Sequence, residues 1–236
     1  MKHIQPKTLQ IMVAVLSAVT FSQRMVWRLC NRTNRVSIGQ VNKVINDLLQ
    51  KGFVEELFRR KRLIRFEKAS PIARVIEDFD TGNATYRLSD PVGLLRYISL
   101  FRSMRELRVF SISVAGKEET VIKELSKKQV IFCLGTAQER FTPYFRPDEV
   151  SFYSSDPDGL YDYLRSAKRG NTKITCYRID YTRNIDDIGS VLDQLFAQKE
   201  GRFRSTTEVQ TVVDMFCDGK GAYTKPLLKS LWGVEI

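Results

Sequence analysis

Apolar residues recur every three or four positions in the first twenty residues, which is the spacing of one face of a helix. The positions concerned are Leu9, Met12, Val13, Leu16 and Val19. They predict a first core helix, and the apolar pattern over Ser22 to Cys30 predicts a second. The run from Ile11 to Val19 is too short to cross a bilayer, although two lysines before it leave a signal peptide conceivable. We expect a soluble, cytoplasmic protein that does not enter a membrane.

The clearest local pattern is a third helix, which follows Ser37 and stops at Gly52. Serine is a good N-cap, and glycine commonly ends a helix. The stripe predicted to be buried consists of Val41, Val44, Ile45 and Leu48. The opposite face is small and amide-rich, and no carboxylate precedes Asp47. Because amides pair with adenine, and lysine with guanine or phosphate, this helix suits the major groove of DNA. Three helices ending in this one predict a helix-turn-helix.

A strongly basic segment comes directly after this helix. Its four consecutive cations are Arg59, Arg60, Lys61 and Arg62. Four cations in a row cannot be buried without partners, so they face solvent or an anion. The flanking residues read as two short strands, and residues 84–88 read as a further strand. A basic hairpin after a recognition helix predicts the wing of a winged helix, in contact with phosphate or the minor groove. Alone, the four cations would be typical of a solvated turn or a localisation signal.

The distribution of charge strengthens this interpretation. The net charge is +11, and residues 1–110 carry 20 Lys and Arg against 9 Asp and Glu. Residues 111–236 carry 18 of each, so the whole excess lies in the first half. Such asymmetry is expected when one domain holds a polyanion, which favours double-stranded DNA as the partner. The predicted DNA-binding residues are Arg32, Arg35, Ser37, Gln40, Asn42, Lys43, Asn46, Arg59, Arg60, Lys61 and Arg62.

The second half alternates between strand and helix patterns, which indicates an α/β layer and not a second bundle. We expect the boundary within residues 100–112, after a helix that opens with Asp90 as N-cap and Pro91 in its first turn. This gives a winged-helix domain with a linker helix over 1–105 and an α/β domain over 106–236. The fold class expected for the chain is therefore α+β.

Several chemistries have little support in the composition. The sole histidine is His3, at the start of the chain, which argues against histidine-ligated metals and histidine-based triads. The four cysteines are Cys30, Cys133, Cys176 and Cys217. They are far apart and form no C-x-x-C, so we expect small core residues in a reducing compartment. We predict no metal site, no cofactor and no catalytic residue.

Two stretches carry a resemblance to a known family. LGTAQERFTPYFRPDEVSFYSS, over Leu134–Ser155, resembles the strand, Gly-Thr, helix, Pro-Tyr, strand block of AbiEi-type proteins. The late stretch over Ser205–Gly233 is similar to their block with a Gln and an Asp on a helix, a glycine-rich break and a Leu-rich helix. RLSDPVGLLRYI, over Arg87–Ile98, is similar to the linker of related winged-helix members. AbiEi-type proteins are the antitoxins and regulators of type IV toxin–antitoxin systems.

The resemblance implies a winged helix joined to a nucleotidyltransferase-like domain that has lost its chemistry. The implied partners, besides DNA, are a cognate toxin or a second copy in a homodimer. A working nucleotidyltransferase holds phosphates at a Gly-Ser type turn and Mg²⁺ on alternating carboxylates. Gly135 and Thr136 stand at the turn, but Asp148 and Glu149 are adjacent, and adjacent residues of a strand point to opposite faces. Asp156 and Asp158 do alternate, but they are expected in a turn, with an N-cap for the next helix.

Two other functions stay open at this point. One is an active nucleotidyltransferase that acts on RNA or protein. The other is an interaction scaffold in which the winged helix binds protein, since a fold alone does not fix its function.

Overall fold

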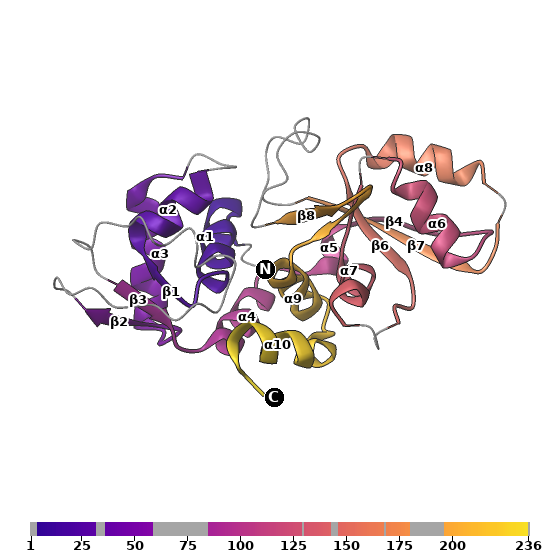
Figure 1. Ribbon diagram of the computed structural model, residues 1–236. Coiled ribbons are helices and arrows are strands. Elements are labelled where there is room, and N and C mark those ends of the chain that lie inside the picture. The colour runs from indigo at the N-terminus through magenta and orange to yellow at the C-terminus, as the bar shows by residue number, and fades with distance from the viewer. Residues whose placement is uncertain are drawn as a thin grey trace. The chain divides into compact units, whose positions relative to one another are not determined.

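The computed structural model describes residues 4–31, 36–58, 85–128, 130–142, 146–167, 169–179 and 196–235 (Figure 1). It combines helices with mixed and antiparallel sheets, so the expected α+β class is confirmed. Contacts divide the chain into an N-terminal unit, Lys7–Leu94, and a C-terminal unit, Leu95–Ile236 with Met1–Pro6. The domain limits at 105 and 106 stay a prediction, because a division by contacts does not test which part folds alone.

The described residues of the N-terminal unit form three helices and a small sheet. Its elements in chain order are α1 (Pro6–Leu16), β1 (Thr20–Ser22), α2 (Gln23–Asn31), α3 (Ile38–Gln50), β2 (Val54–Phe58) and β3 (Thr85–Leu88). The strands are antiparallel in the order β1-β3-β2, so β3 lies in the middle. Phe21 of β1 stands opposite Tyr86 of β3, and their rings stack with centroids 5.8 Å apart. The strand predicted at residues 84–88 is confirmed over Thr85–Leu88.

The first helix is more deeply buried than its apolar stripe suggests. Every residue from Leu9 to Leu16 is buried, including Gln10. Gln10 donates its Nε2 hydrogen to the Cys30 carbonyl at 2.9 Å, which offsets the cost of burying the amide. The placement of Val19 in this helix was wrong: α1 ends at Leu16, and Val19 is 55% exposed. After α1, the Ala18 N–H donates a hydrogen bond to the Val15 carbonyl, and this turn leads the chain into β1.

The C-terminal unit is built on a six-stranded mixed sheet. Its strands are β4 (Arg108–Val114), β5 (Val130–Phe132), β6 (Val150–Ser154), β7 (Thr172–Arg178), β8 (Ala197–Glu200) and β9 (Phe203–Thr206). Their order is β4-β7-β6-β5-β9-β8, with β6–β7 and β5–β9 parallel and the other pairs antiparallel. The helices are α5 (Met104–Leu107), α6 (Glu118–Leu125), α7 (Leu134–Phe141), α8 (Pro157–Arg165), α9 (Glu208–Cys217), the 3-10 turn η3 (Gly221–Thr224) and α10 (Lys225–Trp232). The helix α4 (Pro91–Ser99) precedes them.

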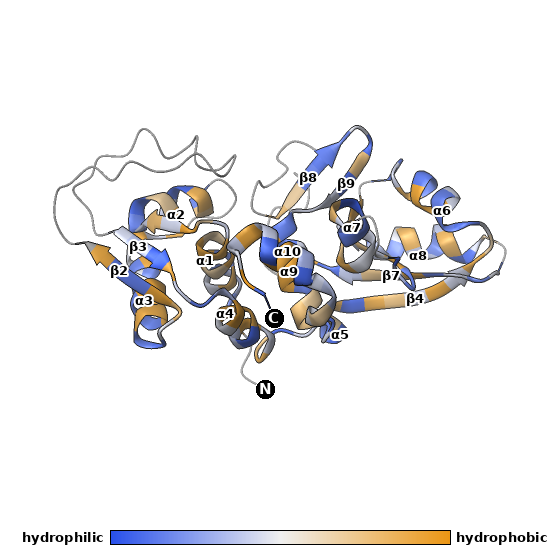
Figure 2. Ribbon diagram, turned by 60° about the horizontal axis from the view of Figure 1, so that its bottom comes forward, coloured by the Kyte–Doolittle hydropathy of each residue, from blue (hydrophilic) through white to orange (hydrophobic). Residues whose placement is uncertain are grey.

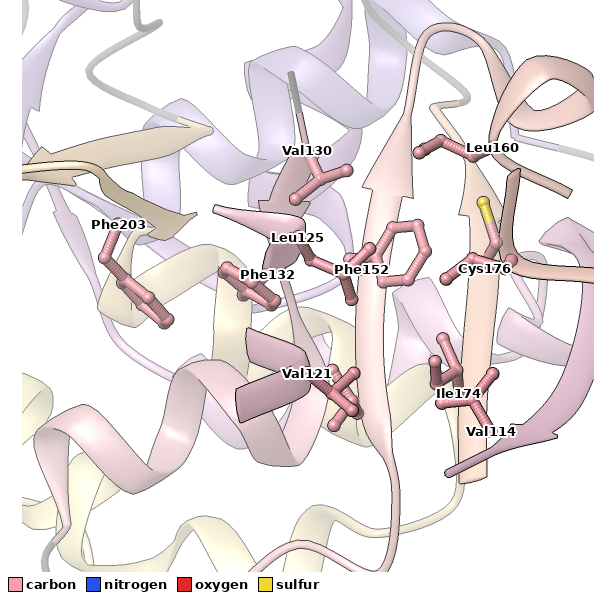
Figure 3. Close-up of a cluster of buried hydrophobic side chains, with 12 residues drawn as sticks. Val114, Val121, Leu125, Val130, Phe132, Phe152, Leu160, Ile174, Cys176 and Phe203 are labelled. Carbon is pink, nitrogen blue, oxygen red and sulfur yellow. The ribbon is translucent and has the colours of Figure 1, made fainter. Parts of the chain in front are cut away.

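Helices cover both faces of this sheet. All five residues of β6 are buried, which is possible only when the sheet is covered on each side. Phe152 of β6 packs with Val121 and Leu125 of α6 and with Leu160 of α8 (Figure 3). On the opposite face, α7 contacts β6, and α9 contacts α7 and β9. The sheet therefore lies between two helical layers.

Predicted and observed elements agree well where the apolar pattern is strong. Within the alternating pattern of the second half, the residues Glu118 to Leu125 predict a helix, and α6 has those limits. The four cysteines are free and buried as expected. Three strands were not predicted: β1, β8 and β9. Two of these strands are the hairpin arms on either side of Gly201, whose φ of 61° lies in the left-handed region that glycine adopts easily. Among the described residues, no helix is long and apolar enough to cross a membrane.

Candidate nucleic-acid interface

The candidate reading helix α3 begins at a complete capping box. The Ser37 hydroxyl accepts a hydrogen bond from the Gln40 backbone N–H at 3.2 Å. In return, the Gln40 side-chain oxygen accepts one from the Ser37 backbone N–H at 3.1 Å. Two main-chain donors that the helix leaves unsatisfied are thereby bonded. The predicted N-cap is confirmed, and the turn at Gly52, with φ 76°, follows the last helical residues as predicted.

The buried and exposed faces of α3 are those that the spacing predicts. Val41, Val44, Ile45 and Leu48 are all buried. Lys43 and Asn46 are exposed and lie one helical turn apart, on the same side as Gly39. The first carboxylate, Asp47, forms an ion pair with Lys51. The outward face of α3 thus offers one cation, one amide and a glycine that permits close approach.

The capping box and burial change the roles open to three predicted residues. Ser37 and Gln40 are engaged in the cap, so the side-chain oxygen of Gln40 is already bonded, whereas its NH₂ group takes no part in the cap. Asn42 is only half-exposed, and its Oδ1 atom is shielded from solvent. Among the predicted base-reading residues, Lys43 and Asn46 are therefore exposed and have no part in the cap.

The predicted phosphate-binding residues lie outside the described residues. They are Arg32, Arg35, Arg59, Arg60, Lys61 and Arg62. In the sequence they stand on two segments between described elements. The first joins α2 to α3, and the second joins β2 to β3.

One exposed group of the N-terminal unit was not predicted. Arg24, Trp27 and Arg28 are exposed on α2, opposite its buried residues Met25, Val26 and Leu29. Their spacing of three and four residues could have placed them on one side of the helix. Two cations beside an indole ring form a surface suited to an anionic partner, because arginine binds phosphate and the ring can stack.

In the C-terminal unit, the turn that resembles a phosphate-binding turn is engaged in a main-chain contact. Leu134 turns the chain from β5 into α7 with a φ of 49°. The Thr136 hydroxyl accepts a hydrogen bond from the Ser151 N–H at 2.9 Å and donates to the Glu149 carbonyl at 3.2 Å. The single hydroxyl hydrogen of Thr136 is thus engaged in a hydrogen bond that links α7 to the start of β6.

The carboxylates near this turn have structural partners. Glu149 accepts hydrogen bonds from Thr175 and Lys173, both at 2.7 Å. Burial raises the pKa of Glu149, but the bonds from Lys173 and Thr175 outweigh it, so the pKa lies below the usual value. Asp148 and Glu149 precede β6, which begins at Val150, so the two adjacent carboxylates lie before the strand and not on it. Asp156 caps α8 by accepting from the Gly159 N–H at 3.0 Å, as predicted.

The Gln and Asp of the late block belong to a buried network. Arg102 donates from Nη1 to Asp214 Oδ1 at 2.8 Å and from Nη2 to the Tyr153 hydroxyl at 3.0 Å. Gln210 donates to the same Asp214 oxygen at 2.7 Å. Burial raises the pKa of the neighbouring Cys133 thiol well above its ordinary value, so this thiol stays protonated. The network ties α9 to β6 and to the residues that follow α4.

The described residues contain no group of three or more His, Cys, Asp or Glu side chains placed to hold a metal ion. Comparisons with known protein families, with curated proteins and with solved structures found no match to this chain.

Proposed function

We propose that the N-terminal unit is a winged helix that binds double-stranded DNA, and that the protein is a sequence-specific transcriptional regulator of the AbiEi-like, antitoxin type. The order helix, strand, helix, helix, strand, strand, with β3 in the centre of the sheet, supports a winged helix. In this arrangement α3 is the recognition helix, and the segment between β2 and β3 is the wing.

The observation that carries the proposal is the outward face of α3. Lys43 and Asn46 are exposed there one turn apart, and the nearest carboxylate is neutralised by Lys51. Asparagine pairs with the N6 and N7 edge of adenine in the major groove, and lysine reaches guanine acceptors or phosphate. Arg24 and Arg28 of α2 add positive charge in the same unit.

The test begins with a genome-wide binding selection and footprinting to obtain a cognate duplex. Titrations then compare cognate and unrelated duplexes for Asn46→Ala and Lys43→Ala. Asn46→Ala is expected to cost about 1–3 kcal/mol on the cognate site and little on unrelated DNA. Lys43→Ala weakens binding to both duplexes if Lys43 contacts phosphate. Lys123→Ala, which removes an exposed lysine of α6, is the charge-matched control and leaves binding unchanged.

A second variant tests the wing. Replacing Arg59, Arg60, Lys61 and Arg62 with alanine is expected to weaken binding to every sequence. It also flattens the dependence of affinity on salt by about one unit per lost phosphate contact. Negligible affinity of the wild-type protein for duplex DNA at physiological salt would contradict the proposal and favour a protein-binding scaffold.

We further propose that the C-terminal unit is nucleotidyltransferase-like but does not transfer nucleotides. Support comes from the Thr136 hydroxyl, which is bonded to the main chain, and from Glu149, which is held by Lys173 and Thr175. The opposing result would be Mg²⁺-dependent labelling of RNA or protein by a nucleoside triphosphate that Asp148→Ala or Asp156→Ala abolishes. If the C-terminal unit does not transfer nucleotides, it would serve to bind a partner protein, such as a cognate toxin or a second copy of the chain.

A further inference from the structure

The strand β4 forms one end of the six-stranded sheet (Figure 2). Within the described part of the chain, β4 pairs with β7 and with no other strand. The outer side of such a strand presents a row of main-chain N–H and C=O groups that can pair with another strand. Proteins usually protect these edges with charges, proline, bulges or short length.

The two ends of the sheet differ in this protection. At the other end, β8 has only four residues and carries Lys199 and Glu200, both exposed. β4 has seven residues, and its regular part, from Phe110 to Val114, contains neither a charge nor a proline. The register with β7 shifts between Arg108 and Phe110, so the regular edge begins at Phe110. Over Phe110 to Val114, β4 is therefore the less protected of the two sheet edges in the described part of the chain.

The sequence of the regular part is complementary to itself. It reads Phe-Ser-Ile-Ser-Val, which alternates apolar and polar residues symmetrically about Ile112. In an antiparallel pair with a two-fold axis at Ile112, Phe110 faces Val114 of the second copy, and Ser111 faces its Ser113. Residues directly opposite always share one face of the sheet, so apolar residues meet apolar ones and serines meet serines.

The apolar side chains on this edge are incompletely covered. Phe110 and Ile112 pack against the core cluster but are only partly buried, whereas Val114 is 4% exposed. The Phe110 ring contacts Tyr161 of α8, with centroids 5.3 Å apart. A second copy on the β4 edge would cover the flanks of Phe110 and Ile112 and pair with the outer main-chain groups of β4 in the same step.

We propose that the protein forms a symmetric dimer through its β4 strands, which pair antiparallel about Ile112 and join two sheets into one. Such a contact is closed, because each copy uses the same edge and none is left for a third copy. The inference concerns the C-terminal unit and does not depend on DNA binding.

Light scattering with size exclusion tests the dimer on the full chain. Wild-type protein is expected at twice the 27.3 kDa of one chain. Ile112→Lys and Ile112→Glu each place like charges directly opposite and should each weaken the dimer by about tenfold or more. An equal mixture of the two variants should form heterodimers, because Lys then faces Glu. Gln198→Lys, at the β8 edge, is the control and stays dimeric.

Cross-linking tests the register with two single substitutions on β4, of which Ser111→Cys replaces a hydroxyl that lies 3.0 Å from the Thr175 hydroxyl. Ser111→Cys and Ser113→Cys introduce exposed thiols, and the four native cysteines are buried. A mixture of the two variants should form a disulfide-linked dimer, since residues 111 and 113 of different copies lie opposite. Either variant alone should form far less, because its own thiols are offset diagonally. Gln198→Cys is the control for random collision.

A wild-type protein that stays monomeric would overturn the proposal. So would a dimer that survives both Ile112 variants, or one in which the mixed Ser111→Cys and Ser113→Cys proteins cross-link no better than each variant alone. Circular dichroism verifies that the Ile112 variants remain folded. If they unfold, the cross-linking of Ser111→Cys with Ser113→Cys still tests the dimer independently.

Discussion

The guanidinium of Arg102 lies 2.8 Å from the carboxylate of Asp214, a residue 112 positions further along the chain. The two side chains are 3% and 0% exposed, so they form a buried ion pair. Removing two charges from water is costly, and the cost is recovered only where the geometry is good and further hydrogen bonds exist. Tyr153 and Gln210 supply such bonds here.

Removing only one partner of this ion pair is expected to destabilise the C-terminal unit strongly. Asp214→Ala removes the charge that faces the buried guanidinium and should lower the free energy of unfolding of the C-terminal unit by about 3–5 kcal/mol. The combined replacement Arg102→Met and Asp214→Leu should recover much of this loss, because no buried charge remains. Urea unfolding monitored by Trp232 fluorescence, in a Trp27→Phe background, measures the change. Lys127→Ala, which breaks an exposed pair with Glu124, should leave stability nearly unchanged.

The capping box of α3 predicts different effects for substitutions that remove its side-chain oxygens and for those that keep them. Ser37→Ala removes the acceptor for the Gln40 N–H and should destabilise the N-terminal unit by about 1 kcal/mol. Ser37→Thr and Gln40→Glu keep the required oxygens and should preserve most of the stability. Thermal unfolding followed by Trp27 fluorescence, with Trp232→Phe, tests this. Equal losses for all three variants would contradict a role of the two capping oxygens in stability.

The environment of Glu149 predicts a pH dependence. Because its pKa is lower in the folded protein than the ordinary 4.5, the ionised form stabilises the fold. This contribution is present above the unfolded pKa and is lost as pH falls through the folded value. Glu149→Gln should therefore cost about 1 kcal/mol at neutral pH, and the difference from wild type should vanish in acid. Urea midpoints measured from neutral pH down to below the ordinary pKa follow this convergence, and a constant difference would contradict it.

Two glycines should respond to alanine in opposite directions. A Cβ atom at Gly170 would lie 2.4 Å from the Ala115 Cα, so Gly170→Ala forces main-chain movement before β7 and should cost about 2 kcal/mol. At Gly39, on the exposed side of α3, the nearest atom is 3.9 Å away, and alanine should stabilise the helix by about 0.5 kcal/mol. Differential scanning calorimetry measures both changes, and a melting temperature that rises for Gly170→Ala would refute the close approach.

Local sequence patterns predicted most of the elements, because the buried face of a helix or the burial of a strand is specified by residues close together in the sequence. The stripe of α3 and the continuous apolar run of β5 each specify a face or a burial state directly. The hairpin of β8 and β9 has the opposite character. Its residues Gln198, Lys199 and Glu200 are polar and exposed, so the strand is defined by pairing with Phe203 to Thr206 and not by its own pattern.

The buried network could not be predicted from either of its ends. An arginine after a helix and an aspartate on another helix both look like surface residues, and their contact exists only because the fold places α9 next to the residues that follow α4. The resemblance singled out Gln210 and Asp214 without giving them a role. The structure assigns them a structural one, as the partners of Arg102 and of each other. The DNA-binding assignments rest on exposure and chemistry, so they stay predictions until the titrations are done.

The parallel pairing of β5 with β9 has a consequence for biosynthesis. Phe132 of β5 pairs with Ser205 of β9, so the middle of the sheet is completed only by a strand that leaves the ribosome late. The elements from Lys7 to Leu94 are contiguous and can associate while translation continues. Until β9 and α9 emerge, β5 has a vacant neighbour and Arg102 lacks its counter-ion. Nascent chains are therefore expected to acquire a folded N-terminal unit first and to depend on chaperones over the interval that follows.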